Sequence, residues 1–252
     1  MSDEKRDTAA SFGGAAEDYF ESAVHRESDD LRVLASWCAD ADRALDVATG
    51  GGHTAGAIAA AGVPNVVASD LSPEMLAVAT REYPVQGALA DAEDLPFADA
   101  SFDAVACRIA AHHFPDPEAF VAETARVLEP GGVLAFEDNV APADDELATF
   151  LNGVEKLRDP THVELYSVAQ WRDWFEREGL AVEAVETAAI TLDFEDWTAR
   201  TNVSEADKAE LRRRFREAPD GAHERFSVAF DDEGDVVSFA NPKALIRARK
   251  VD

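Results

Sequence analysis

Short apolar runs alternate with longer amphipathic segments between residues 43 and 140. Five runs are candidate strands: ALDVA (44–48), NVVASD (65–70), VQGALA (85–90), FDAVAC (102–107) and GVLAFED (132–138). Brief runs rich in Val and Ala, separated by segments long enough for a helix, are typical of parallel strands joined by crossover helices. The pattern predicts an α/β fold built on a mostly parallel sheet.

The clearest helix signal lies between the last two runs. Asp116 can cap a helix, Pro117 suits its first turn, and the apolar spacing continues to the EPGG stop at 129–132. Beyond Pro142 the spacing predicts helices near 144–157, 167–178 and 205–218, a strand at 180–187 and a hairpin through 225–240. We therefore predict a Rossmann-like, doubly wound sheet of seven strands, with an antiparallel C-terminal hairpin, N-terminal helices and a helical lid.

The organisation predicted along the chain is one domain. Residues 1–12 are polar and are expected to be disordered, whereas residues 15–38 carry apolar side chains at roughly helical intervals. No repeat and no shift of composition marks a second domain, so residues 13–252 are assigned to a single domain. Its ligand-binding core is expected at about 43–140, with lid and substrate elements at about 13–38, 143–178 and 195–220.

The charge balance is extreme. Fifty-one Asp and Glu against 23 Lys and Arg give a formal net charge of −28, and the acids are scattered along the chain. Such a surface repels nucleic acid and anionic membranes, so neither is an expected partner. The dispersed acidity indicates adaptation to very high salt, as in a halophilic archaeon, because salt screens the self-repulsion. The alternative, a surface that binds a cationic protein, lacks a localised patch.

Cysteine usage and the N-terminal segment predict a soluble cytoplasmic protein. Only Cys38 and Cys107 occur, and the chain opens with the charged MSDEKRD. No apolar run approaches the length of a membrane span. The six His share no ligand spacing with Cys or acids, so no metal site is expected. Cys107 ends an apolar strand, which indicates a structural thiol.

The stretch ALDVATGGGHTAGAIAAAG, residues 44–62, combines a strand, three glycines and an alanine-rich helix. Glycines there let the backbone approach a ligand, and the amino end of the helix presents N–H groups to it. Gly50, Gly52 and Ala55 satisfy a variant of the dinucleotide fingerprint, with Asp70 where a ribose-binding acid belongs. This match alone permits an NAD-dependent enzyme, and also a tight turn that binds no ligand.

Two further acids favour a nucleotide ligand with a positive charge. Asp46 lies in the strand before the glycines, where it would repel a pyrophosphate and stabilise a cationic group. Asp91 follows the third strand and can accept a hydrogen bond from an adenine amino group. Because the carboxyl ends of parallel strands share one edge, Asp46, Asp70 and Asp91 are expected to converge, and S-adenosylmethionine fits this set. Taken singly, each Asp could instead cap a helix or end a loop.

The same motifs resemble a known family. The resemblance is carried by LDVATGGGHTA, VVASDLSPEML, the segment 90–138 and NGVEKLRDPTHVELYSVAQW. The chain resembles the class I S-adenosylmethionine-dependent methyltransferases, in the type 11 branch that includes ubiquinone and menaquinone biosynthesis enzymes. The resemblance covers about residues 19–180. It implies a cofactor site formed by Tyr19, Asp46, Ala48, Gly50, Gly52, Asp70, Leu71, Asp91, Ala92 and Arg108. Ala48 departs by one methyl group from the glycine usual at its position.

Candidate substrate groups follow the fourth and fifth strands and the region after Pro142. Methyl transfer is an in-line displacement, so the enzyme positions the acceptor and removes a proton where the acceptor is neutral. The candidate bases are His112 and His113, and the candidate substrate contacts are Asp138, Asn139, Arg158 and His162. Each has a structural alternative, such as a histidine packed on the sheet edge or a helix stop at Asp159 and Pro160.

The sequence thus predicts methyl transfer from S-adenosylmethionine to a small molecule. It leaves open the acceptor and whether C, N or O is methylated, with a quinone precursor among the candidates. One alternative is an NAD-dependent oxidoreductase on the same architecture, which Asp46 disfavours. Another is a cofactor-binding module that regulates a partner without catalysis.

Overall fold

The structure, a computed structural model, describes residues 3–14, 16–21 and 29–251. The chain forms two compact units: unit 1 comprises Met1–Asp138, Arg172–Glu186 and Leu245–Asp252, and unit 2 comprises Asn139–Trp171 and Thr187–Ala244. The single domain expected from the sequence stays a prediction. The division arises because unit 2 is built from two inserted segments that have a core of their own, which composition does not reveal. Within the described ranges, no helix has the length and apolar character needed to cross a membrane.

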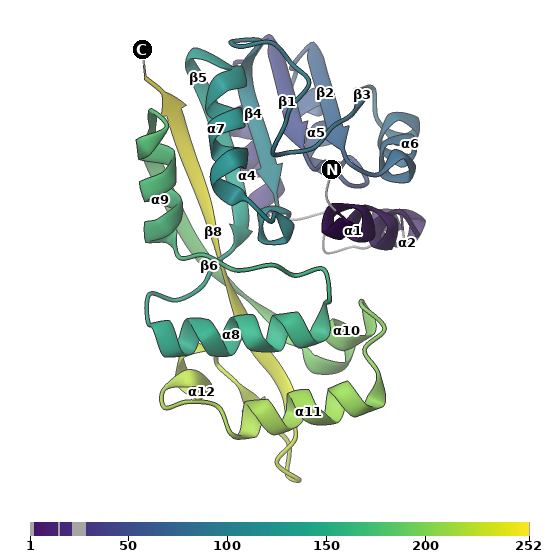
Figure 1. The fold of residues 1–252 in the computed structure, drawn as a ribbon, viewed down its shortest axis with the longest axis vertical. Coiled ribbons are helices and arrows are strands. Elements are labelled where there is room, and N and C mark those ends of the chain that lie inside the picture. The colour runs from purple at the N-terminus through teal and green to yellow at the C-terminus, as the bar shows by residue number, and fades with distance from the viewer. Residues whose placement is uncertain (1–2, 15, 22–28, 252) are drawn as a thin grey trace. The chain divides into compact units, whose positions relative to one another are not determined.

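Parallel strands form the sheet of unit 1 (Figure 1). β1 (Arg43–Val47) pairs in parallel with β2 (Asn65–Asp70) and with β4 (Phe102–Arg108). β3 (Gln86–Leu89) pairs with β2, and β5 (Leu128–Asn139) pairs with β4, both also in parallel. The chain therefore leaves β1 in opposite directions to reach β2 and β4, and this reversal opens a crevice at the carboxyl ends of the strands.

The complete strand order is β3-β2-β1-β4-β5-β8-β6, with β7 paired to β8. β6 (Leu180–Asp193) and β8 (Val236–Lys250) each contribute residues to both units. β7 (Ala229–Phe230) runs antiparallel to β8, which confirms the predicted C-terminal hairpin. The sheet has eight strands where seven were expected, because β7 is a two-residue strand in addition to the seven of the main path.

The two faces of the unit 1 sheet differ in side-chain size. On one face, α4 (Asp29–Trp37) and α5 (His53–Ala60) pack on small strand residues, namely Ala44, Ala68, Ala104, Ala106 and Ala135. On the other face, Phe136 contacts Phe120 of α7 (Pro117–Val127) and Phe175 of α9 (Val168–Arg177). Helix α7 begins as predicted, since the Asp116 side chain accepts a hydrogen bond from the Ala119 N–H.

The expected disorder of residues 1–12 is wrong for the part that the structure describes. Asp3–Gly14 forms helix α1, followed by α2 (Ala16–Glu21). Half-buried positions in α1 are Lys5, Thr8, Ala9, Phe12 and Gly13, while the positions between them are exposed. This spacing follows one helical face. The face is too polar to be recognised from hydrophobicity, and it packs on other elements of unit 1, including α6 (Pro73–Glu82).

Unit 2 has an aromatic core within a frame of helices. α8 (Asp145–Arg158) and α11 (Glu205–Arg216) lie close to the predicted positions, whereas α10 (Phe194–Ala199) and α12 (Ala222–Arg225) were not predicted. The core includes Phe194, Trp197, Leu211, Phe215, Phe226 and Phe239. These six side chains come from α10, α11 and β8 and from the residue after α12, all in the second inserted segment. Leu151 and Val154 of α8 join the same core from the first segment, so the core holds the two segments together.

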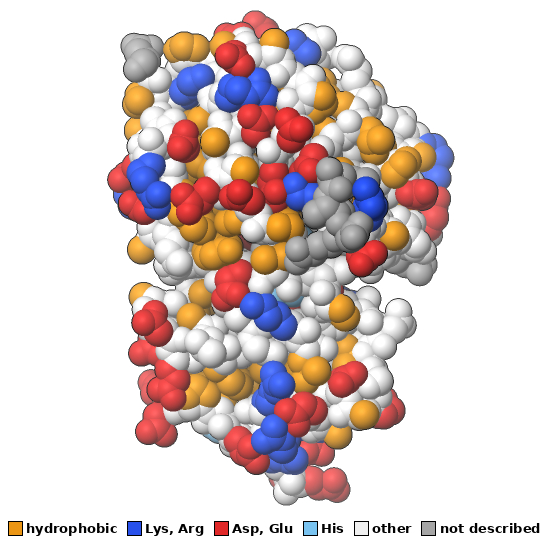
Figure 2. All heavy atoms as spheres, viewed as in Figure 1, with side chains coloured by type: hydrophobic (Ala, Val, Ile, Leu, Met, Phe, Trp, Pro, Cys, Tyr) orange, Lys and Arg blue, Asp and Glu red, His pale blue; other side chains and the backbone are white. Residues whose placement is uncertain are grey.

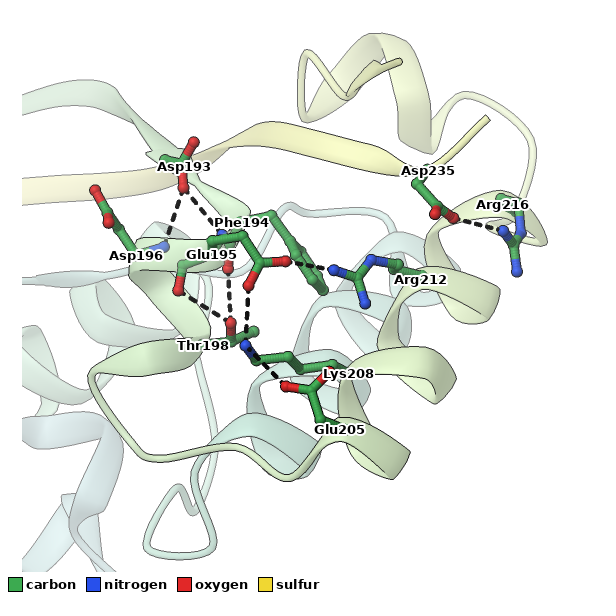
Figure 3. A network of polar contacts seen from close by, with 10 residues as sticks. All are labelled: Asp193, Phe194, Glu195, Asp196, Thr198, Glu205, Lys208, Arg212, Arg216 and Asp235. Atoms are coloured by element: carbon green, nitrogen blue, oxygen red, sulfur yellow. Dashed lines mark hydrogen bonds and ion pairs between the residues drawn. The ribbon is translucent and has the colours of Figure 1, made fainter. Parts of the chain in front are cut away.

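Ion pairs join α10 to α11 (Figure 3). Asp193 caps α10 by accepting hydrogen bonds from the N–H groups of Glu195 and Asp196. The Glu195 carboxylate pairs with Lys208, 2.9 Å away, and with Arg212. The remaining arginines of α11 are paired with acids as well. The basic run LRRRFR (211–216) is therefore part of a network of surface ion pairs, and its arginines are neutralised by neighbouring acids.

Charge is distributed over the surface and is not gathered in a tail. On the face drawn in Figure 2, acidic side chains are spread among lysines and arginines. Pairs such as Arg81 with Glu17 join neighbouring elements of unit 1. The two oxygens of Glu17 accept from this guanidinium at 2.7 and 2.9 Å.

Two helical glycines should respond oppositely to alanine. A Cβ on Gly56 in α5 would lie 2.2 Å from Cδ1 of Tyr83, whereas a Cβ on Gly153 in α8 would meet Arg214 Nη1 at an ordinary 3.6 Å. We expect Gly56→Ala to lower the free energy of unfolding by about 1–3 kcal/mol because of overpacking. Gly153→Ala should raise it by about 0.5–1 kcal/mol through helix propensity. Chemical unfolding of the two variants checks both signs; a stabilised Gly56→Ala protein would contradict the packing of α5 on α6.

Candidate functional site

A pocket lies at the carboxyl edge of the unit 1 sheet. Together with the open space at its mouth it spans about 1020 Å³, and its lining comes from the loop after β1, from the ends of β2 and β4 and the residues after β2, β3 and β4, and from α1. The pocket lies where ligands bind in open, doubly wound sheets. The residues predicted from sequence that line it are Ala48, Gly50, Asp70, Leu71, Asp91, Ala92, Arg108 and His113.

Asp46 holds the glycine loop from behind. It is 1% exposed, and its Oδ2 accepts hydrogen bonds from the Thr49 hydroxyl and from the Ala55 N–H at 3.0 Å. Burial raises the pKa of Asp46 to about 7, although the bonds from Thr49 and Ala55 oppose this shift. The carboxylate joins the loop to the first turn of α5. Its contacts are with the protein backbone and Thr49, and the direct contact with a cationic ligand stays a prediction.

Asp70 holds the same loop from the neighbouring strand. Its Oδ2 accepts from the Gly50 N–H at 2.9 Å and its Oδ1 from the Ser72 N–H at 2.8 Å. Burial raises the pKa of Asp70, and the backbone hydrogen bonds counteract that effect. Unlike Asp46, it lines the pocket, so the lone pairs it does not use for the backbone can face a ligand.

The loop carries backbone strain beside the pocket. Ala48 adopts φ 53°, a left-handed conformation that glycine adopts more easily. Ile109, directly after β4, has φ 52°, and a β-branched residue rarely takes this conformation. Both line the pocket. Gly52 does not line it; a Cβ there would lie 2.7 Å from the Ala79 Cβ, so this glycine permits α5 to pack on α6.

A buried ion pair forms the wall at the ends of β4 and β5. Arg108 Nε donates to Glu137 Oε2 at 2.9 Å, and the two side chains are 6% and 0% exposed. Burial raises the pKa of Glu137, and the neighbouring Arg108 opposes this shift. The pairing fixes the Arg108 side chain at the edge of the pocket.

His112 and Asp138 form a buried dyad in unit 1. The Asp138 carboxylate, 1% exposed, accepts from the His112 backbone N–H at 2.9 Å and from its Nδ1 at 2.6 Å. Where Nδ1 donates to the Asp138 carboxylate, Nε2 is the basic nitrogen of a neutral imidazole. His113 lines the pocket, and its ring lies 4.2 Å from that of His112. The sequence indicated His112, His113 and Asp138 as candidates but did not indicate the hydrogen bonds between His112 and Asp138.

The other predicted substrate residues belong to unit 2. Arg158 Nε donates to Glu155 at 2.9 Å, and its guanidinium lies 5.4 Å from the Trp197 ring centre. Nε2 of His162 lies 2.9 Å from Asn152 Oδ1. Asn139 begins unit 2 directly after Asp138. Their substrate contacts stay predictions, and the Tyr19 side chain lies outside the described residues.

Several pocket residues were missed from sequence. His53, the first residue of α5, lines the pocket with Nδ1 2.7 Å from the Tyr83 hydroxyl and Nε2 3.1 Å from the Phe20 carbonyl oxygen. Glu93 and one face of α1 also line it. The GGGHT spacing placed His53 at the helix start, whereas the contribution of α1 had no sequence signal.

Two further sequence expectations concern metals and thiols. Across the described residues, no group of three or more His, Cys, Asp or Glu could hold a metal ion. Cys107 is fully buried, and burial raises the pKa of its thiol well above the ordinary value. A thiol of this kind is not activated as a nucleophile.

Comparisons with known proteins agree with this geometry. The profile of a methyltransferase domain matches residues 45–136. The uncharacterized methyltransferase YcgJ of Bacillus subtilis is 32% identical over 247 residues, covering 95% of this chain and 97% of YcgJ. A crystal structure from Bacillus halodurans, provisionally described as a methyltransferase, superposes with a TM-score of 0.84 at 39% identity and covers 89% of this chain and 100% of that one. A demethylmenaquinone methyltransferase of Chlorobaculum parvum is 44% identical over 89 residues, 35% of this chain and 37% of that enzyme.

The raised pKa of Asp46 predicts a pH-dependent stability. Between pH 4 and 7 the folded protein holds a proton on this buried carboxyl that the unfolded chain releases, so stability falls as pH rises through this window. At about 1.4 kcal/mol per unit, the loss is on the order of 2–4 kcal/mol. Asp46→Asn keeps an acceptor for Thr49 and Ala55 and should lack this loss. Chemical unfolding at pH 5 and pH 8 measures the difference; parallel changes in both proteins would exclude a raised Asp46 pKa.

Proposed function

The chain belongs to the methyltransferase family, and we propose that it transfers a methyl group from S-adenosylmethionine, bound in the unit 1 pocket, to a small molecule. The observation that carries the proposal is the pocket itself. It lies beside the glycine loop, and Asp70 and Asp91 present carboxylates at the ends of two adjacent strands. Carboxylates at these positions suit the hydroxyl and amino donors of a nucleoside, and the buried Asp46 behind the loop disfavours the pyrophosphate of a dinucleotide.

Each part of the cofactor has a proposed partner in unit 1. Asp70 would accept hydrogen bonds from the ribose hydroxyls, with Leu71 beside it. Asp91 would accept from the adenine amino group, with Ala92 along the ring edge. Ala48, Gly50 and the Arg108 guanidinium would surround the methionine part. All of these residues line the pocket, which supports the assignment.

We propose the His112–Asp138 dyad as the base for an acceptor that loses a proton. The carboxylate holds the imidazole in the tautomer with a basic Nε2 and stabilises the imidazolium that forms after proton transfer. His113 contributes to the wall of the donor pocket. S-adenosylmethionine held there would supply the methyl group as an electrophile, and His112 would take the proton that the acceptor loses as the acceptor's electron pair forms the bond to that methyl group.

The acceptor is proposed only as a small molecule, with a quinone precursor as one candidate. Only 37% of the demethylmenaquinone methyltransferase aligns with this chain, so this relative supports the reaction more than the substrate. A net charge of −28 supports a small-molecule acceptor over nucleic acid. The domain profile and the relatives described above are named as methyltransferases. They lend no support to the oxidoreductase alternative.

The proposal predicts binding of S-adenosylhomocysteine, the demethylated product. Titration calorimetry at high salt should show one site per chain, and Asp70→Asn should weaken binding by about 1–3 kcal/mol because a carboxylate acceptor is lost at a buried polar contact. Glu118→Gln, an exposed acid on α7, is the matched control and should bind as the unaltered chain does. Absence of binding by folded protein, or competition by NAD, would reject the proposal.

Catalysis predicts labelled product. Incubating the chain with S-adenosylmethionine carrying a labelled methyl group and a small-molecule extract of the source organism should give a labelled metabolite. His112→Gln should slow the labelling about 10²–10⁴-fold while S-adenosylhomocysteine still binds, because a positioned base is lost. Product formation that stays at the unaltered rate would exclude His112 as the base. No labelled product in any extract would favour the non-catalytic regulatory module.

A further inference from the structure

One face of helix α1 forms part of the wall of the donor pocket. Lys5, Thr8, Ala9 and Phe12 line it, and they recur at the three- and four-residue intervals of a single helical face. Arg6, Asp7, Ala10 and Ser11, on the opposite face, are exposed. The helix therefore covers the pocket and leaves the ligand space beneath it.

The Lys5 ammonium is bound by two carboxylates at the adenine end of the proposed site. It lies 2.8 and 2.7 Å from the two oxygens of Asp91 and 2.5 Å from Oε2 of Glu93. The three side chains are only 15%, 18% and 10% exposed. The attraction within ion pairs so shielded is screened less by water and salt than the attraction within surface pairs.

The carboxylates of Asp91 and Glu93 are held in place by hydrogen bonds that do not involve Lys5. Asp91 Oδ1 accepts from the Glu93 N–H at 3.0 Å, and Glu93 Oε1 accepts from the Asp116 N–H at 2.8 Å. Both acids are thus held by the backbone of unit 1, the second by the start of α7. Lys5 reaches them on a flexible side chain from α1, so it is the partner that can leave.

The other end of α1 is held by packing. The Phe12 ring meets the His113 ring edge to face at 5.0 Å. A Cβ on Gly13 would lie 2.8 Å from Glu74 Oε2 and 2.9 Å from Ser72 Oγ, which shows how closely the helix approaches the start of α6. The polar contact at Lys5 and the packing at Phe12 and Gly13 lie two helical turns apart.

We propose that α1 is a lid over the donor pocket and that Lys5 is its latch, a positioning residue that sets how long the cofactor product stays bound. The inference rests on the proposed function, because it takes the ligand to be S-adenosylhomocysteine. The ligand occupies the space beneath α1, and the Lys5 pairs with Asp91 and Glu93 break before it leaves. Lid opening of this kind commonly limits product release.

The test is a chase experiment on three variants. Labelled S-adenosylhomocysteine is bound and displaced by excess unlabelled compound. Lys5→Gln should accelerate its release about 10-fold because the charge-assisted contacts are lost. Lys5→Arg keeps the charge and should stay near the unaltered rate. Arg6→Gln removes the same charge from the exposed face and is the matched control. An unchanged release rate in Lys5→Gln, or equal acceleration in Arg6→Gln, overturns the latch.

A second measurement separates the latch from the proposed function. Hydrogen–deuterium exchange of the α1 amides, without any ligand, should be faster in Lys5→Gln than in the unaltered chain and in Arg6→Gln. If S-adenosylhomocysteine fails to bind but exchange follows this order, the donor assignment is wrong, and Lys5 is still the residue that holds α1 over the pocket. If the compound binds and exchange is equal in the three proteins, the latch is wrong and the donor assignment stands.

Discussion

Two carboxylates, the buried Asp46 and the half-buried Asp70, shape the turn between β1 and α5, and the pocket depends on that turn. Asp46 bonds to Thr49 and to the Ala55 N–H, and Asp70 bonds to the Gly50 N–H. Without these acceptors, backbone donors of a tight loop would be left unsatisfied away from water. The loop could then relax out of the left-handed conformation at Ala48. The same hydrogen bonds bring α5 close to the sheet, where its alanines pack on those of the strands.

The acidic residues at this edge of the sheet have different structural roles that the sequence does not distinguish. Asp46 is buried and bonds to the loop after β1, whereas Asp70 bonds to the same loop and also lines the pocket. Asp91 and Glu93 lie further along the same edge, where Lys5 neutralises part of their charge. At the end of β5, Asp138 orients His112 and Glu137 orients Arg108, the last residue of β4. The carboxyl edge of the sheet is therefore an acidic rim whose members are each bonded to a specific donor.

The position of α1 over the pocket explains why this segment is helical although it has few apolar residues. Only Phe12 offers α1 a large apolar contact along the pocket face, and Lys5 and Thr8 complete that face with polar groups. Such a helix is stabilised by a complementary surface and not by an apolar stripe. Its contacts connect the N-terminus of the chain to the end of the site where adenine recognition is proposed.

Much of unit 1 was determined by the sequence alone, because local signals specify it. Periodic apolar runs marked β1 to β5, Asp116 and Pro117 marked the start of α7, and the glycines with Asp70 and Asp91 marked the edge where the pocket lies. These features depend on side-chain period, capping and strand direction, which short segments carry themselves. Only the tertiary structure decided that α1 is ordered, that His112 bonds to Asp138, that Asp46 faces the loop and that the inserted segments form unit 2. Each of these depends on pairings between residues distant in the chain, and no local pattern encodes such a partner.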